Sequence, residues 1–249
     1  MSRSDHFSAV ADGYARFRPS YPAELFTHLA SLVGRCRLAW DCATGSGQAA
    51  VALAEHFDRV VATDLSQSQI DSASQHRRVE YRAVAAEEPT LEDSSVDLVT
   101  VAQALHWLDL PSFYAEVERV LSADGVIAVW CYNNLQASPR VNAVVNRYYS
   151  QVVGPYWPPE RRLLEAGYRT VPFPFVEVDV PEIDMRADWT LERLLGYLET
   201  WSATTRYRAA EKKDPMAIIA DDLRAAWGDP EEPQTIRWPL HLRVGRLDL

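Results

Sequence analysis

Two glycines stand in residues 40–50, WDCATGSGQAA, between an apolar run and a segment with a helical pattern. Glycine is needed where a backbone takes a positive φ or approaches a ligand closely, and a helix N-terminus favours negative charge. Gly45, Gly47 and Ala50 also satisfy the G-x-G-x-x-A pattern of a dinucleotide site. The stretch therefore predicts a nucleotide-binding turn, without deciding which nucleotide it holds.

An acidic residue lies at the end of each of the first two predicted strands. Asp64 follows Gly45 by 19 residues, and a carboxylate there can accept both ribose hydroxyls of an adenosine, whichever cofactor carries it. Asp41 precedes Gly45 by four residues, inside the end of the first strand. A pyrophosphate would not favour this negative charge, whereas an α-ammonium or a sulfonium would. Asp41, and a full helix before the first strand, favour a cationic cofactor.

Further residues that could do chemistry follow the fourth predicted strand. Gln103, Ala104, His106 and Trp107 come at the point where open α/β sheets bind their ligands. His106 could act as a general base, because the ordinary pKa of an imidazole is close to neutral pH. It could equally be a packed, hydrogen-bonded histidine, so both interpretations stay open. Trp107 is expected to form part of the wall of the site.

Short apolar runs that alternate with helical patterns would position these residues. This alternation predicts a doubly wound α/β fold with a mostly parallel, seven-stranded sheet. The near-continuous apolar strands indicate burial on both faces. We expect strands at residues 38–42, 59–63, 79–84, 96–102, 126–131, 175–180 and 240–247, and helices at residues 22–33, 48–57, 66–75 and 111–121.

The second half of the chain is less regular. Residues 133–170 are expected to be helical, but prolines at positions 155, 158 and 159 forbid one continuous helix. Residues 189–201 have helical periodicity, and Thr190 is of a type that caps helices. We predict a single domain over residues 1–249, with an N-terminal cap segment (1–34), a cofactor-binding core (35–132), and helical lid insertions with the final strands (133–249).

Composition restricts the partners and the compartment. With 25 Lys and Arg against 35 Asp and Glu, the chain carries a formal charge of −10, which disfavours nucleic acid and an anionic membrane as partners. Arg161, Arg162 and Arg169 could form a local basic patch, although a solvated helix face is the favoured interpretation. No apolar run approaches the roughly 18 residues of a membrane span, and no signal-peptide pattern is present. Three cysteines without a CxxC pair suit a reducing compartment. We expect a cytoplasmic protein without a metal site.

Several segments, taken in order, resemble class I S-adenosylmethionine-dependent methyltransferases. Residues 38–70, LAWDCATGSGQAAVALAEHFDRVVATDLSQSQI, are similar to the cofactor motif and acidic strand of that family, and residues 85–109 and 119–130 are similar to its next segments. Residues 14–22, YARFRPSYP, and 196–207, GYLETWSATTRY, are similar to a branch of small-molecule enzymes that includes trans-aconitate methyltransferase. The resemblance implies a Rossmann-like methyltransferase fold with S-adenosylmethionine as cofactor.

The resemblance also implies roles for individual residues. The turn would receive the methionine moiety, Asp64 the ribose hydroxyls, and Leu65 would pack near the adenine; for Asp64 the alternative is a helix N-cap. Main-chain groups of Ala86 and Glu87 would contact the adenine, although Glu87 could be a solvated loop acid. The implied cofactor-binding residues are Tyr14, Arg18, Asp41, Ala43, Gly45, Gly47, Gln48, Asp64, Leu65, Ala86, Glu87, Gln103 and Ala104.

One position departs from the family pattern D-x-G-x-G-x-G, because Ala43 occupies the place of its first glycine. Alanine fits there if the φ of this residue is negative, whereas a positive φ would weaken cofactor binding. In the family the segment that holds Tyr14 and Arg18 folds over the cofactor. Arg18 could grip a carboxylate of cofactor or substrate, or form a surface ion pair.

Aromatic residues after the fifth strand are candidates for the acceptor pocket. Tyr156, Trp157, Trp201 and Tyr207 could line a lid over the methyl acceptor, although aromatic residues at helical spacing are also typical of a core.

The prediction is a methyltransferase that acts on a small molecule, with a carboxylate or another compact polar group as acceptor. A carboxylate needs no general base, whereas a phenol, an amine or a carbon acid would give His106 that role. The alternatives are an NAD(P)-dependent oxidoreductase that uses the same glycine turn, and a non-catalytic cofactor-binding relative, which Ala43 would suit. A monomer and a homodimer both stay open.

Overall fold

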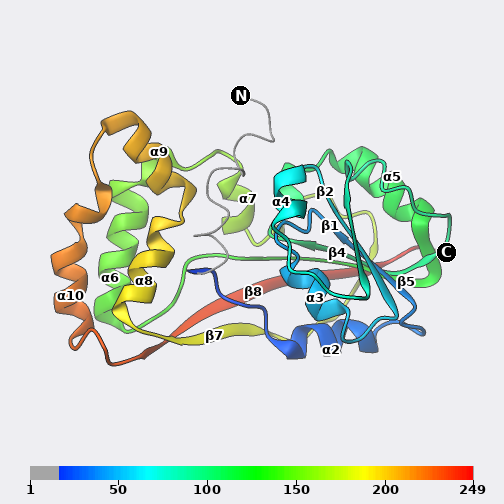
Figure 1. The fold of residues 1–249 in the computed structure, drawn as a ribbon, viewed down its shortest axis with the longest axis horizontal. Coiled ribbons are helices and arrows are strands. Elements are labelled where there is room, and N and C mark those ends of the chain that lie inside the picture. The colour runs from blue at the N-terminus through cyan, green and yellow to red at the C-terminus, as the bar shows by residue number, and fades with distance from the viewer. Residues whose placement is uncertain (1–16, 249) are drawn as a thin grey trace.

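The computed structural model describes residues 17–248, which form a doubly wound α/β fold (Figure 1). Parallel strands at its centre follow the order β3-β2-β1-β4-β5. The chain moves outward from β1 to β3 and then returns to β4, so a topological switch point lies between the carboxyl ends of β1 and β4, where ligands of such sheets bind. The strands are β1 (Leu38–Cys42), β2 (Arg59–Asp64), β3 (Val79–Ala83), β4 (Val96–Ala102) and β5 (Leu121–Tyr132).

Three later strands complete the sheet. β8 (Gln234–Arg246) runs antiparallel to β5, and β6 (Val176–Val178) pairs antiparallel with β8. The first half of β8 pairs instead with β7 (Asp184–Trp189). Pro239 lies where β8 passes from one partner to the other, so its missing N–H interrupts neither ladder in the middle. The prediction of a seven-stranded, mostly parallel sheet is confirmed, and β7 is an addition to it.

Short helices cover both faces of the sheet. α2 (Ala23–Ser31) and α3 (Gln48–Leu53) pack on one face, and α5 (Leu110–Val120) packs on the other. α4 (Gln67–Asp71) contacts β2 and β3. Successive residues of a strand point to opposite faces: Ala39 belongs to the apolar cluster of α2 and α3, whereas Trp40 packs against Phe113 of α5. This double burial explains the near-continuous apolar runs of the sequence.

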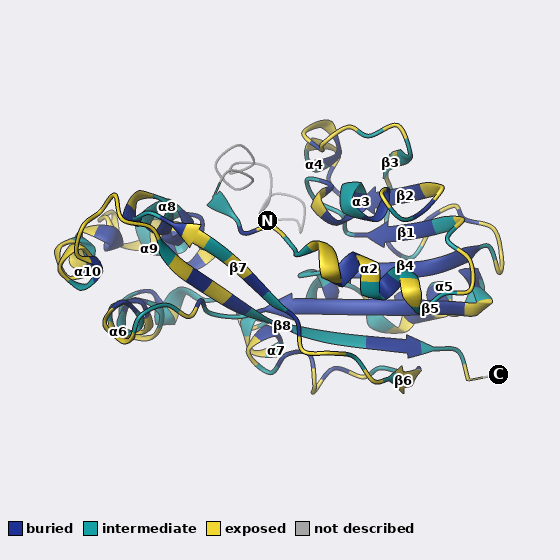
Figure 2. Cartoon of the chain, turned by 90° about the horizontal axis from the view of Figure 1, so that it is seen from below, coloured by how far each residue is buried: buried dark blue, intermediate teal, exposed yellow. Residues whose placement is uncertain are grey.

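A second lobe of helices lies beyond the carboxyl ends of the parallel strands, and β7 with the first half of β8 connects it to the sheet (Figure 1). Figure 2 shows the contrast between the mostly buried central strands and β7, which is exposed in part. A π-helical turn (Tyr148–Val152), a 3-10 turn (Gly154–Tyr156) and α7 (Arg161–Glu165) lead from this lobe back toward the sheet. The helices of the lobe are α6 (Pro139–Arg147), α8 (Leu191–Glu199), α9 (Ser202–Glu211) and α10 (Ala220–Trp227), with a 3-10 turn at Pro215–Ile218.

β1 and β4 have the predicted bounds, but other elements differ. β5 begins at Leu121, and its pairing with β4 skips residues 122–125, so the Asp-Gly turn is a bulge within this strand rather than a break before it. Trp189 ends β7, whereas we expected it to begin a helix; that helix starts after Thr190, its N-cap residue. β7, the first half of β8, α9 and α10 are additions to the predicted elements. No helix in the part of the chain from residue 17 to 248 is long and apolar enough to cross a membrane.

Candidate active site

The turn after β1 has the backbone geometry of a ligand-binding loop. Gly45 and Gly47 have φ values of 55° and 79°, in the left-handed region that glycine adopts freely. Gly47 is the N-cap residue of α3, and a Cβ atom there would lie 2.1 Å from the Tyr81 hydroxyl. At Gly45 the nearest atom to such a Cβ, in the Gln69 side chain, would be 3.8 Å away. Gly47 is therefore fixed by φ and by space, whereas Gly45 is fixed by φ alone.

Ala43, which replaces the first glycine of the family pattern, also has a positive φ, of 55°. An L-residue in the left-handed region is strained by roughly 1–2 kcal/mol. The condition under which we expected Ala43 to weaken cofactor binding is therefore met in the backbone. Whether the strain affects binding or only folding depends on whether the turn changes when the cofactor binds.

Asp41 holds this turn in place through hydrogen bonds. Its carboxylate is 1% exposed and accepts hydrogen bonds from the Thr44 hydroxyl at 2.5 Å and the Thr100 hydroxyl at 2.7 Å. Thr44 belongs to the turn and Thr100 to β4, so Asp41 connects the turn to the neighbouring strand. Burial raises the pKa of Asp41 to about 6, and the nearby Asp64 contributes to this rise.

Asp64 lies at the end of β2 and holds the turn from the other side. Its Oδ2 accepts the backbone N–H of Gly45 and its Oδ1 that of Ser66, both at 2.9 Å. Ser66 is the N-cap residue of α4, so Asp64 also bonds the beginning of this helix, and its two suggested roles are compatible. A carboxylate has about four acceptor positions, so capacity for two ribose hydroxyls is left. Leu65, the next residue, is 61% exposed, and an adenine ring could cover this apolar surface.

Three carboxylates surround the carboxyl end of β1. The pKa of the Cys42 thiol is raised by burial, which has the largest effect, and by the charges of Asp41, Glu87 and Asp64. Each of these acids therefore lies near that thiol. Ala86 is buried in the apolar cluster that contains Cys42. The combined field of the three carboxylates attracts an ammonium or a sulfonium and repels a pyrophosphate. The arrangement therefore fits S-adenosylmethionine better than a dinucleotide.

The polar residues after β4 are already engaged within the protein. Gln103 has a φ of 57°, its side-chain amide donates to the Tyr132 carbonyl at 3.3 Å, and its side-chain oxygen accepts the Tyr132 N–H at 3.2 Å. This pair of bonds joins the ends of β4 and β5. These bonds fix the orientation of the Gln103 side chain and leave its second N–H, with the backbone of Gln103 and of the half-buried Ala104, for contacts to a cofactor.

His106 lies in a 3-10 turn directly after β4 and contacts Tyr168. The Tyr168 hydroxyl is 2.9 Å from Nδ1 of His106, and backbone amides of Leu105 and His106 interact with the same oxygen. Burial raises the Tyr168 pKa far above its ordinary value, so the phenol keeps its proton. Because two backbone amides already donate to its oxygen, we assign the phenol as the donor to Nδ1 and not as the acceptor. Burial and, to a smaller extent, Arg161 lower the pKa of His106 to about 3. The imidazole is therefore neutral, with its basic nitrogen occupied and its hydrogen on Nε2; Trp107 packs against the ring at 4.7 Å.

The predicted lid aromatics separate into two groups. Trp157 and Trp201 pack at 5.5 Å from each other, and Tyr149 joins both of them at 5.0 and 5.7 Å. Tyr156 and Tyr207 form a separate pair at 5.0 Å, and the Tyr156 hydroxyl donates to Glu211. The first group, and not the second, lies beside Arg161, whose influence reaches His106.

The sequence interpretation of Arg161 is wrong. It is half buried rather than on a solvated helix face, and its guanidinium stacks on Trp157 at 4.7 Å. Its neighbour Arg162 is exposed, as expected. The aromatic residues just before Arg161 in the sequence were the only signal that could have indicated this burial.

The N-terminal segment crosses the space between the two lobes. Arg18 donates to the Tyr132 hydroxyl and to the Thr200 carbonyl, both at 3.4 Å, so it joins the end of β5 to the end of α8. The Gln48 side chain donates to the Pro19 carbonyl at 3.2 Å and thus ties this segment to α3. Tyr14, also predicted to bind the cofactor, lies outside the described residues.

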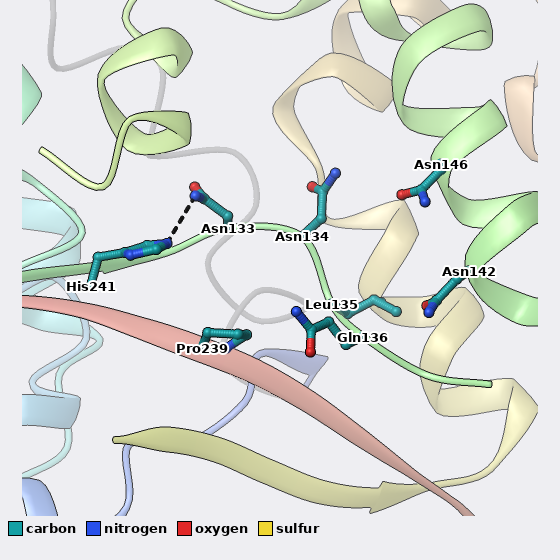
Figure 3. A pocket seen from close by; sticks show the side chains of 8 residues that line it. All are labelled: Asn133, Asn134, Leu135, Gln136, Asn142, Asn146, Pro239 and His241. Carbon is teal, nitrogen blue, oxygen red and sulfur yellow. Dashed lines mark hydrogen bonds between the residues drawn. The ribbon is translucent and has the colours of Figure 1, made fainter. Parts of the chain in front are cut away.

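A hollow of about 370 Å³ lies apart from the glycine turn, beside the segment that follows β5 (Figure 3). Its lining includes Asn133, Asn134 and His241, but neither Asp64 nor His106. The Asn133 amide is 3.2 Å from Nε2 of His241, as the dashed line in Figure 3 marks. The hollow is therefore not the nucleotide site, and Asn134 connects it with the surroundings of Arg161.

Known proteins are similar to this chain along most of its length. A family model described as "Methyltransferase domain" matches residues 40–129. A Dictyostelium discoideum protein, provisionally named a methyltransferase, is 35% identical over 227 residues, which are 90% of this chain and 86% of that protein. A solved structure, provisionally described as a type II methyltransferase of Anaeromyxobacter dehalogenans, superimposes with a TM-score of 0.88 and 45% identity, over 92% of this chain and 97% of the other. A Saccharomyces cerevisiae protein, named a probable S-adenosylmethionine-dependent methyltransferase, is 28% identical over 48% of this chain and 44% of that protein.

Proposed function

Because this chain belongs to the class I S-adenosylmethionine-dependent methyltransferases, we propose that it methylates a small molecule at a carboxylate or another compact polar group. The observation that carries this acceptor class is the state of His106, the nearest candidate for a general base. An acceptor of the kind used by the trans-aconitate branch remains the more specific prediction.

The residues at the switch point fit the cofactor. Bound S-adenosylmethionine supplies a methyl group on a sulfonium, ready for an in-line displacement. Asp64 has free acceptor positions for the ribose, exposed Leu65 offers a surface for the adenine, and the acids around Cys42 favour the positive charges of the methionine part. The same acids argue against the NAD(P)-dependent alternative, since a pyrophosphate would meet their charge.

The environment of His106 supports an acceptor that is already nucleophilic. A base must be able to take up a proton, but Nδ1 accepts the Tyr168 proton, and a pKa of about 3 makes the imidazole a poor base at neutral pH. A carboxylate is ionised at neutral pH and has a lone pair to offer without proton removal. His106 can still donate a hydrogen bond from Nε2 and so help to orient an acceptor oxygen.

Calorimetry and a methyl-transfer assay test this proposal. We expect S-adenosylhomocysteine to bind and NAD not to bind; the reverse result would contradict the assignment. With methyl-labelled S-adenosylmethionine and a panel of small carboxylic acids, amines and phenols, we expect the label in methyl esters, which mild alkali hydrolyses to methanol. Alkali-stable products alone would rule out the carboxylate. Absence of transfer to every acceptor, with S-adenosylhomocysteine bound, would favour the non-catalytic relative.

Replacement of His106 by asparagine separates the two roles of this residue. For a carboxylate acceptor we expect kcat of His106→Asn to stay within about threefold of the unmodified protein, with the same pH profile, because no proton is transferred. A loss of 100-fold or more, together with the disappearance of a titration from the pH profile, would show that His106 is a base after all.

A further inference from the structure

Arg161 is a partly buried cation whose described hydrogen-bond partners are all neutral. Its Nε donates to the Tyr149 hydroxyl at 3.0 Å and its Nη2 to the Asn134 side-chain oxygen at 3.4 Å. Other arginines, such as Arg119 and Arg243, form salt bridges with carboxylates. Within residues 17–248, no carboxylate lies at salt-bridge distance from the Arg161 guanidinium. A charge withdrawn from water in this way is costly unless an anion compensates it.

Two aromatic rings hold the plane of this guanidinium. Trp157 lies 4.7 Å and Tyr149 5.4 Å from it, at distances typical of cation–π contacts. Stacked rings hold a guanidinium in place without using all of its N–H donors, so a bidentate face remains for a planar anion. The Glu165 carboxylate accepts a hydrogen bond from the Tyr149 hydroxyl, which in turn accepts one from Arg161.

The position of Arg161 places this charge beside the proposed site of methyl transfer. It is the first residue of α7, which lies between the sheet and the second lobe (Figure 1). Its Nη2 donates to Asn134, two residues after the end of β5. Trp157, which stacks on its guanidinium, packs at 5.5 Å against Trp201, just after the end of α8. Its charge also acts on His106 after β4. The cofactor end of the site carries the acids around Cys42 and would repel an anionic acceptor on its own.

We propose that Arg161 binds a second carboxylate of the methyl acceptor, a compact organic diacid, and so selects the diacid over its monoamide. This inference rests on the proposed methyltransferase function. Asn134 and Tyr149 orient the guanidinium, and Trp157 covers its face. The chain thereby combines a negative pocket for the cationic cofactor with a positive group for the acceptor.

Adjacent arginines of α7 give a matched pair of variants. Arg161→Gln removes the charge but keeps an amide donor, Arg161→Lys keeps the charge without the fork, and Arg162→Gln removes an exposed charge one residue away. Each variant is assayed for methyl transfer to a panel of small dicarboxylic acids and to their monoamides, in which one carboxylate stays available as the methyl acceptor. Calorimetry with S-adenosylhomocysteine and thermal unfolding are measured in parallel.

For Arg161→Gln we expect KM for the diacids to rise about 10–100-fold, because a charge-assisted bidentate contact is lost. KM for the monoamides should change by less than threefold, and Arg162→Gln should behave as the unmodified protein. Arg161→Lys should lie between them. An unchanged KM for the diacids in Arg161→Gln, or equal losses for diacids and monoamides, would overturn the proposal.

The cofactor measurement distinguishes the two possible failures. If S-adenosylhomocysteine did not bind to the unmodified protein, the proposed function itself would be contradicted. Binding in every variant, with a diacid preference that survives Arg161→Gln, would contradict only the role of Arg161. No transfer to any acid, with S-adenosylhomocysteine bound, would overturn both the carboxylate acceptor and this role.

Discussion

Replacement of Ala43 by glycine tests the geometry of the nucleotide turn. The positive φ of Ala43 belongs to a turn that bonds within the protein already hold, from Asp64 to Gly45 and from Thr44 to Asp41. Its strain is therefore a cost of folding first. Removal of the strain of a left-handed alanine raises the free energy of unfolding by about 1–2 kcal/mol. The greater conformational freedom of glycine in the unfolded chain lowers the free energy of unfolding by about 0.4–1 kcal/mol.

The balance predicts that Ala43→Gly stabilises the fold by about 0.5–1 kcal/mol. For a chain of this size, such a gain corresponds to a rise in Tm of about 1–4 °C. The Kd of S-adenosylhomocysteine should stay the same or fall, because glycine accommodates the same backbone without strain. Thermal and urea denaturation measure the first effect, and isothermal titration calorimetry measures the second.

A matched control keeps the result specific to the left-handed backbone. Ala166 ends α7 with a φ of −77°, so Ala166→Gly should lower stability by about 0.4–1 kcal/mol, the ordinary effect of glycine. Opposite signs for the two variants would support the reasoning. It would be refuted if Ala43→Gly were destabilised like the control, or if it lost cofactor affinity markedly, since either result would mean that the turn needs the alanine.

Two further predictions concern the same turn. Because burial raises the pKa of Asp41 to about 6, its charge should appear as pH rises through that value, so S-adenosylhomocysteine, which carries an ammonium group, should bind more tightly at about pH 7 than at about pH 5. Asp41→Asn should flatten this calorimetric profile, and a flat profile in the unmodified protein would count against the role of Asp41. The pKa of Asp41 is 3.8 in the unfolded chain and about 6 in the folded protein, so between these values the folded state binds more protons. The contribution of Asp41 to the free energy of unfolding therefore falls as pH rises through this window. Urea titrations of the protein and of Asp41→Asn at both ends of the window would measure this fall. Gly47→Ala should destabilise the protein by about 2–4 kcal/mol, because the added methyl group would meet the Tyr81 hydroxyl and because the alanine would have to take a positive φ. Adding Tyr81→Phe should recover part of this loss in urea denaturation, and no recovery would mean that space is not the cause.

The strands at the centre of the sheet could be read from the sequence because local pattern and tertiary burial agree there. β1 and β4 are buried along nearly their whole length, and apart from Asp41, Asp97 and Thr100 their residues are apolar. β7 and the first half of β8 contain many polar residues, because they form a ribbon that connects two lobes and is exposed in part. Their pairing comes from contacts between distant segments, which residue periodicity does not encode.

The cofactor end of the site was largely visible in the sequence. Glycine, aspartate and leucine at fixed spacings in residues 41–65 each answer a local requirement of the turn, and the family relationship gives S-adenosylmethionine as cofactor. The acceptor end was less visible. Tyr156 and Tyr207 were natural candidates, but they pair with each other and with Glu211, whereas Arg161 was taken for a surface charge.

The sequence by itself determined the class of fold and the positions of the central strands along the chain, since these depend on short-range pattern. The residues that meet the cofactor stay a prediction. The tertiary structure alone decided the charge states and directions of the reactive groups. His106 is neutral because burial and the charge of Arg161, 55 residues away, lower its pKa to about 3. Burial raises the pKa of Asp41 to about 6. Arg161 is half buried because Tyr149 and Trp157 stack on its guanidinium. Each of these properties depends on burial and on partners that only the folded chain brings together.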